Sequence, residues 1–284
     1  LQHVVADITG QTGMQIIRAI LAGTHDPRVL ANFRDRRCRR SVEEIAHALE
    51  GHYRPEHLFA LQQAVALYDT YQAQIAACDQ RIEAALAPLR APEPPADPLP
   101  PPTGTTRQKN ALAFDVRAAL YGIVGVDLTQ IHGLGTSLAL KLVAECGTDL
   151  SAWPTAKHFV FWLCLSPGNK ISGGKLLSAR TRRTSNRATS LLRLAAVSVG
   201  KTESALGAFY RRLAMRVGKA KAITATARKL AILFYNTLRH GRDYRDPGAS
   251  AYENRHRERV LHHLERRARQ LGYVLEPAPV AGVS

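Results

Sequence analysis

Apolar residues recur every three or four positions over most of the chain, which is the spacing of amphipathic helices. Before a proline-rich centre, this pattern predicts a short helix at 14–21 and another at about 42–50. Ser41 and Glu44 have the spacing of a capping box at the start of the second helix. Strand-like alternation is absent except over residues 166–177. The pattern therefore predicts an all-α fold, or nearly so.

The longest periodic stretch is a heptad repeat that begins before the proline-rich centre. Its seam positions follow a 3-4 spacing and are Leu58, Leu61, Val65, Tyr68, Gln72, Ile75, Asp79, Ile82, Leu86 and Leu89. Two of them are polar, and polar residues on such a seam usually set register or partner number. We expect a long helix that forms a homo-oligomeric coiled coil, with an ordinary bundle helix as the alternative.

A proline run interrupts the helical pattern. Eight of the 15 residues from 88 to 102 are Pro, which ends a helix and favours an extended polyproline II segment. We interpret residues 88–105 as a linker, with a proline-rich ligand for a recognition module as the alternative. The linker separates a helical coiled-coil region at 1–87 from a helical domain at 106–275, which a tail at 276–284 follows.

Beyond the linker, the helical spacing resumes between breaks that contain Gly and Pro. The predicted helices are 106–120, 127–132, 136–146, 155–164, 184–199, 203–217, 219–239 and 249–271.

Positive charge is concentrated in the second half of the chain. The 284 residues carry a formal net charge of +16, with −2 on residues 1–103 and +18 on residues 104–284. Residues 166–245 alone hold 18 Lys and Arg against two acidic residues. A segment of one sign favours a polyphosphate partner, with nucleic acid ahead of a membrane surface.

Several classes of protein are disfavoured by what the sequence lacks. No apolar run approaches the roughly 18–20 residues of a membrane span, and the first residues do not resemble a signal peptide. The four cysteines form no Cys-x-x-Cys pair, so we expect a reducing cytoplasm rather than disulfides or zinc. The contexts of Asp7, Asp26, Asp35 and Asp127 are typical of caps and turns. We therefore expect no metal site or cofactor in this chain.

Residues 128–143 match the helix-hairpin-helix form. Gly133 and Gly135 permit a tight turn whose backbone amides can approach a phosphate, and Ala139 permits close helix packing. Lys141 adds positive charge to the same stretch. The alternative is a glycine-rich turn between two helices that binds no ligand.

Residues 165–187 form a second candidate site, a polar loop rich in Gly and basic residues. The candidate phosphate-binding side chains are Lys170, Lys175, Arg180, Arg182, Arg183 and Arg187. Ser166, Ser172 and Ser178 are candidate nucleophiles, or else ordinary loop residues. Neither a G-x-S-x-G elbow nor a Walker lysine motif is present. The surrounding cations suit attack on a phosphodiester, whose oxygens guanidinium groups bind well.

These stretches resemble the bacterial insertion-sequence transposases of the DEDD-plus-serine class, the bridge-RNA-guided recombinases. The resemblance extends over residues 4–27, 54–86, 128–175 and 221–241. It implies a C-terminal serine transposase domain in which Ser172, within N-K-I-S-G-G-K, is the nucleophile, with Ser178 and Ser166 as fallback positions. It also implies transient phosphoserine links to DNA and a structured guide RNA that chooses the target and donor sites.

In that family, an N-terminal RuvC-like domain carries four metal-binding carboxylates. This sequence has no such segment and no initiator Met, so we expect a C-terminal portion that is inactive alone. Mg²⁺ is expected only for the missing RuvC-like domain. The alternatives are a non-catalytic nucleic-acid-binding remnant and a helical scaffold that oligomerises through residues 58–89. The recombinase hypothesis requires Ser172 to be exposed beside the loop arginines, facing the same way as the Gly133–Gly135 turn.

Overall fold

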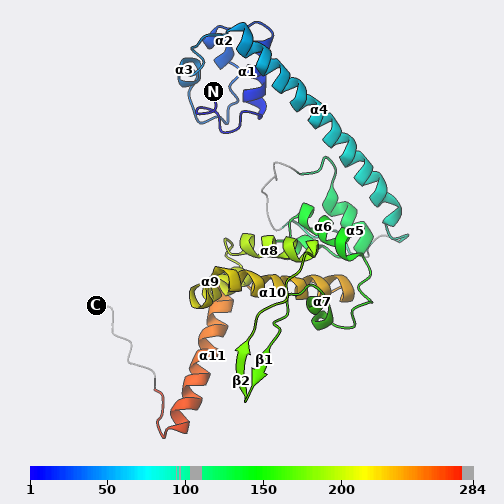
Figure 1. The fold of residues 1–284 in the computed structure, drawn as a ribbon, viewed down its shortest axis with the longest axis vertical. Helices are drawn as coiled ribbons and strands as arrows, with labels where there is room; N and C mark the ends of the chain where they lie inside the picture. The colour runs from blue at the N-terminus through cyan, green and yellow to red at the C-terminus, as the bar shows by residue number, and fades with distance from the viewer. Residues whose placement is uncertain (94, 96, 103–110, 277–284) are drawn as a thin grey trace. The chain divides into compact units, whose positions relative to one another are not determined.

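A computed structural model gives the architecture of two compact units, which we describe separately. The structure describes residues 1–93, 95, 97–102 and 111–276. The units are Leu1–Cys78 and Asp79–Ser284. Most described residues are helical, and the described strands form a single two-stranded sheet (Figure 1), so the prediction of a nearly all-α fold is confirmed. Within the described residues, no helix is both long and apolar enough to cross a membrane.

The N-terminal unit is a small cluster of short helices joined to the start of a long one. Its elements are α1 (Gln11–Leu21), α2 (Pro27–Ala31), α3 (Val42–His47) and the first part of α4 (Pro55–Leu86). Ile16, Leu30 and Ile45 are 0% exposed and form its core. The predicted capping box is confirmed, since the Ser41 hydroxyl accepts a hydrogen bond from the Glu44 amide and the Glu44 carboxylate accepts one from the Ser41 amide.

The predicted long helix is present as α4, followed by a 3-10 turn, η1 (Ala87–Leu89). None of the α4 residues is buried, and the seam residues Ile75 and Ile82 are 52% and 38% exposed. The seam residues Leu58 and Leu61 instead pack against the N-terminal core, so only the later apolar positions of the seam are left for a partner. The coiled coil itself stays a prediction.

The C-terminal unit contains the remaining helices and the sheet. They are α5 (Val116–Val124), η2 (Leu128–Gln130), α6 (Thr136–Cys146), α7 (Ala156–Trp162), β1 (Lys170–Ser172), β2 (Lys175–Ser178), α8 (Arg187–Val199), α9 (Ala205–Val217), α10 (Lys219–His240) and α11 (Gly248–Gln270).

Two of the helices predicted in this unit differ most from the structure. The helix predicted at 106–120 begins only at Val116, where the Asp115 carboxylate accepts a hydrogen bond from the Ala118 amide, while residues 106–110 lie outside the described part. The helix predicted at 127–132 is wrong in type, because η2 is a single 3-10 turn that ends at Gln130, where Ile131 takes an extended conformation as its C-cap.

Helix α10 lies at the centre of the C-terminal core and packs against α7, α8 and α9 (Figure 1). Leu230, Phe234 and Tyr235 on its inner face are at most 1% exposed, and they contact Phe159 of α7 and other apolar residues. The Tyr235 hydroxyl donates a hydrogen bond to the Trp153 carbonyl oxygen at 2.5 Å, so this buried polar group is satisfied.

A buried ion pair joins α5 to η2. The Arg117 Nη2 donates to the Asp127 carboxylate at 2.5 Å, and the two side chains are only 14% and 3% exposed. Burial by itself opposes ionisation of Asp127, but hydrogen bonds from Arg117, Thr129 and Gln130 outweigh it and hold the pKa of Asp127 below its ordinary value. Asp127 therefore remains a carboxylate inside the fold.

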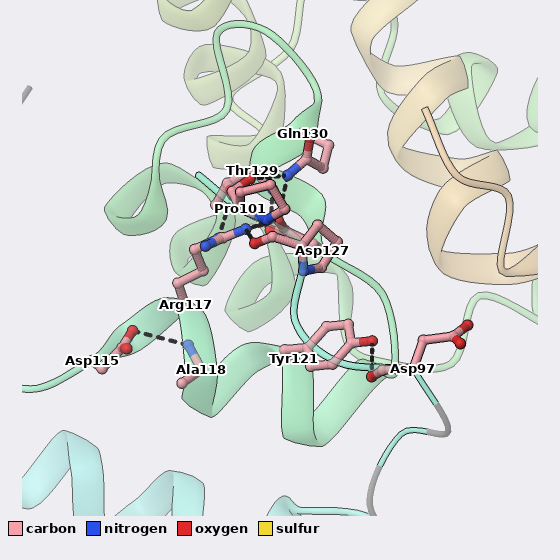
Figure 2. Close-up of polar contacts among 10 residues, drawn as sticks. Asp97, Pro101, Asp115, Arg117, Ala118, Tyr121, Asp127, Thr129 and Gln130 are labelled. Carbon is pink, nitrogen blue, oxygen red and sulfur yellow. Dashed lines mark hydrogen bonds and ion pairs between the residues drawn. The ribbon is translucent and has the colours of Figure 1, made fainter. Parts of the chain in front are cut away.

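The same group of side chains also holds part of the proline-rich segment (Figure 2). The carbonyl oxygens of Pro100 and Pro101 accept hydrogen bonds from Arg117 and Gln130, and that of Asp97 accepts one from the Tyr121 hydroxyl at 2.8 Å. The described part of the segment thus lies against α5 and η2. The domain boundaries proposed from the sequence stay predictions.

Replacing Asp127 by Ala should destabilise the C-terminal unit strongly. The substitution leaves the Arg117 guanidinium buried without its carboxylate, which typically costs about 3–5 kcal/mol. Urea unfolding at pH 7 measures the loss. Asp149→Ala is the matched control, because its ion pair with Arg239 is exposed and such pairs contribute about 0–1 kcal/mol.

The stability gap between the wild type and Asp127→Ala should depend on pH. The pKa of Asp127 is lower in the folded state than in the unfolded state. Its contribution to the free energy of unfolding is therefore fully present above the unfolded-state pKa of about 3.9, and it is lost as the pH falls through the folded-state pKa. The difference in free energy of unfolding between the wild type and Asp127→Ala should therefore be largest at neutral pH and should decrease below about pH 4. A gap that stays constant into acid would contradict this account.

Candidate nucleic-acid interface

The serine-containing loop folds as an antiparallel β-hairpin. Strands β1 and β2 pair Ile171 with Leu176 and Ser172 with Lys175. The two residues between them, Gly173 and Gly174, have φ values of +55° and +73°. A two-residue turn with positive φ at both positions favours glycine, because a Cβ atom is strained in that conformation. The Gly-Gly pair between two short apolar stretches is the sequence signal that would have predicted this hairpin.

Ser172 lies at the tip of this hairpin, next to the turn. All residues of β1 are exposed, and the Ser172 hydroxyl has no hydrogen-bond partner among the residues that the structure describes. Its cross-strand neighbour is Lys175, which is also exposed. The other two candidate serines are half-buried, and the Ser178 hydroxyl accepts a hydrogen bond from the Arg180 amide. Of the three serines, Ser172 is the most accessible to a large substrate.

The base of the hairpin is attached to the helical core at several points. Pro167 pairs with Thr181, and the Gly168 amide donates to the Arg180 carbonyl oxygen at 3.1 Å. The hydroxyl of Thr189, in the first turn of α8, donates to the Leu163 carbonyl oxygen at 2.6 Å, which joins both ends of the loop. Figure 1 shows the hairpin projecting from the helices, so the core positions its base and leaves its tip free.

The predicted basic side chains of this loop are all exposed, but they differ in their partners. Arg182 donates to the Phe161 carbonyl oxygen at 2.8 Å and lies 4.1 Å above the Phe161 ring. Arg187 forms an ion pair with Glu145 at 3.1 Å. The side chains of Lys170, Arg180 and Arg183 have no ion-pair partner within the described residues. Arg182 and Arg187 therefore have structural contacts that the sequence did not reveal.

The helix-hairpin-helix stretch forms a tight turn between η2 and α6. A Cβ atom on Gly133 would lie 2.3 Å from the Val199 Cγ2 atom, so the glycine is required where this turn presses against α8. Gly135 is the N-cap of α6, and Ala139 is 0% exposed, which agrees with the close packing expected of it. Lys141 is exposed on α6. Much of the Gly133 requirement is thus explained by packing inside the protein.

The structure does not bring the two predicted sites together. In Figure 1 the tip of the hairpin lies on the other side of α10 from α6, whose start carries the glycine turn. The glycine turn packs onto α8, whereas the hairpin leaves the core after α7. The expectation that Ser172 and the Gly133–Gly135 turn face the same way stays a prediction.

The basic segment nonetheless forms a largely exposed surface. None of the 18 Lys and Arg of residues 166–245 is buried. Part of this charge lines a hollow of about 1020 Å³ between α9 and α11. Arg211, Arg212 and Arg216 of this segment contribute to it together with Arg259 of α11. Burial and the charges of Arg212, Arg259 and Arg216 lower the pKa of His256. This hollow was missed in the sequence, because its arginines come from two helices far apart in the chain.

The four aspartates considered in the sequence analysis accept hydrogen bonds from backbone amides. Each accepts a hydrogen bond from an amide two residues later: Asp7 from Thr9, Asp26 from Arg28, Asp35 from Arg37 and Asp127 from Thr129. Their interpretation as caps and turns is confirmed. Within the described ranges, no three His, Cys, Asp or Glu side chains gather as a metal site would require.

Comparison with known proteins gives one match. Residues 127–211, under a third of the chain, match the family model described as "Transposase IS116/IS110/IS902 family". The matched stretch runs from the start of η2 through the hairpin and α8 into α9. The comparisons with curated proteins and with solved structures gave no significant match. On this evidence the helix-hairpin-helix and serine-hairpin region is similar to the transposases of the IS116/IS110/IS902 family, which supports an insertion-sequence transposase.

Proposed function

We propose that this chain is the DNA-handling portion of an insertion-sequence transposase and that Ser172 is its nucleophile. The observation that carries the proposal is the exposure of Ser172 beside Lys175 on a projecting hairpin. A duplex is too wide to enter a narrow cleft, so a nucleophile on a projecting tip suits a nucleic-acid substrate. The match of the same region to a transposase family supports the choice of DNA.

The proposed reaction is a transesterification. The Ser172 Oγ atom forms a bond to phosphorus while the bond from phosphorus to a deoxyribose oxygen breaks, and the serine proton ends on the released hydroxyl. Attack by a strand hydroxyl on the phosphoserine reverses the step and frees the serine, so strand exchange needs no external energy source. Lys175, the cross-strand neighbour of Ser172, stabilises the negative charge that develops on the non-bridging oxygens.

Two partners belong to the same proposal. A structured guide RNA binds the exposed basic surface and chooses the DNA sites, as the family resemblance implies. A second copy of the chain pairs with α4 and forms the homo-oligomer expected from the heptad repeat; the exposure of the seam residues Ile75 and Ile82 supports this part of the proposal. Metal-dependent steps of the family belong to a RuvC-like domain, and we assign no residue of this chain to them.

A second candidate is a nucleic-acid-binding module without catalysis. Arg182 contacts Phe161 and Arg187 pairs with Glu145, so fewer guanidinium groups are left to stabilise a reacting phosphate. This observation favours the non-catalytic candidate. Both candidates predict that the chain binds nucleic acid, but only the first predicts a covalent protein–DNA adduct.

Binding of duplex DNA should weaken steeply as salt is raised. Each phosphate contact adds about 0.9 to the slope of log K against log salt, so a surface using five or more contacts should lose at least about a hundredfold between 50 and 200 mM salt. Fluorescence anisotropy with labelled DNA measures the slope. An affinity that changes little over this range would contradict a surface based on residues 166–245.

Ser172→Ala should abolish the covalent protein–DNA adduct and leave DNA affinity within about twofold, because only the attacking oxygen is lost. The assay uses the full-length protein, including any RuvC-like domain, and detects labelled DNA that stays with the protein on a denaturing gel. Ser185→Ala, an exposed serine of the same loop, is the control and should keep the adduct. Adduct formation by Ser172→Ala, or its loss in Ser178→Ala or Ser166→Ala instead, would refute the assignment.

A further inference from the structure

The arginines of the N-terminal unit are unevenly placed. Residues 1–78 contain eight Arg and eight acidic residues, so the unit has no net charge. Five of these arginines nevertheless lie within residues 34–40, and we call this segment the arginine loop. It connects α2 to α3 and lies outside both the serine hairpin and the stretch that matches the transposase family.

One arginine of the loop has a structural role. Arg34 is half-buried, and its guanidinium donates to the carbonyl oxygens of Cys38 and Arg40, each at 2.5 Å. The Asp35 amide donates to the Thr12 hydroxyl at 3.0 Å, which attaches the loop to α1. These contacts hold the backbone in a defined turn, so the neighbouring side chains start from fixed positions.

The side chains of the other four arginines are exposed to solvent. Arg36 and Arg39 are exposed and have no hydrogen-bond or ion-pair partner within the described residues. The Arg37 side chain is 84% exposed although it contacts Asp35, and the Arg40 side chain is 55% exposed although it contacts Glu44. A guanidinium has five N–H donors, so Arg37 and Arg40 keep donors for a further acceptor.

Three of these four side chains border a hollow large enough for more than one phosphate. Arg37, Arg39 and Arg40 line a hollow of about 800 Å³, with residues 2–7 and 10–12 also contributing to its walls. The acidic groups that face it are Asp7 and Asp35, and both already accept hydrogen bonds inside the protein. The unengaged groups at this site are therefore predominantly donors with positive charge.

We infer that the arginine loop is a second nucleic-acid contact of this chain, which binds backbone phosphates through Arg36, Arg39 and the free donors of Arg37 and Arg40. A pair of planar guanidinium groups on a fixed turn matches the spaced oxygens of a phosphodiester chain. The inference rests on the proposed function only in taking nucleic acid as the partner. It does not depend on Ser172 or on catalysis.

The test compares two double variants of the full chain that each remove two positive charges from the same unit. Arg36→Gln/Arg39→Gln removes the two unpaired arginines of the loop, and Arg28→Gln/Arg54→Gln removes two exposed arginines elsewhere. Both variants should keep the wild-type circular dichroism spectrum, since none of the four side chains is buried. Anisotropy titrations use a 20-base-pair DNA duplex and an RNA hairpin in parallel, each over a range of salt.

The loop variant should bind about tenfold more weakly at 0.1 M salt, and its salt slope should be shallower by about 2, because two phosphate contacts are lost. The control variant should change affinity by less than about twofold. The probe that shows the larger loss, DNA or RNA, identifies the natural strand at this site. If the loop variant misfolds, Arg39→Gln alone should still lower the slope by about 1.

Equal effects of the loop and control variants would overturn the inference, since the response would then reflect net charge alone. Unchanged binding of both probes by the loop variant would overturn it while leaving the proposed function intact. Failure of the wild type to bind either probe would overturn both.

Discussion

The burial of one face of α10 against α7, α8 and α9 is the interaction on which the rest of the C-terminal unit depends. This face carries small residues toward its start, including Ala227 and Ala231, and large ones toward its end, including Phe234 and Tyr235. Small residues let the neighbouring helices approach closely, and the aromatic rings fill the wider space near α7. Because α7 and α8 are both anchored to α10, the ends of the loop between them are fixed.

The serine hairpin follows from this arrangement. Its two ends leave a rigid core, Thr189 joins them through the Leu163 carbonyl oxygen, and the Gly173–Gly174 turn closes the far end. A two-stranded hairpin is only marginally stable alone, and its apolar residues Ile171 and Leu176 are exposed here. The hairpin is thus built as a projection whose base is held by the fold and whose tip is left for a substrate.

Arginine has two distinct roles in this protein, and the total charge does not distinguish them. Arg34, Arg117 and Arg182 direct their guanidinium groups to carbonyl oxygens of the protein itself, where they hold loops in place. Others, such as Arg36 and Arg183, have no such partner among the described residues. The number of arginines therefore gives only an upper limit on the positive charge that is available to bind a nucleic acid.

The sequence by itself determined the helical fold class, the Ser41 capping box, the aspartate caps and the position of the basic segment, because each depends on residues a few positions apart. The β-hairpin was visible in the sequence only as a weak strand-like alternation. Helix α2 was missed, although Asp26 followed by Pro27 is a signal for the start of a helix. Only the tertiary structure decided that Gly133 serves packing on α8 and that Arg187 is paired with Glu145. These contacts join residues distant in the chain, and no local spacing encodes which side chains the folded core brings together.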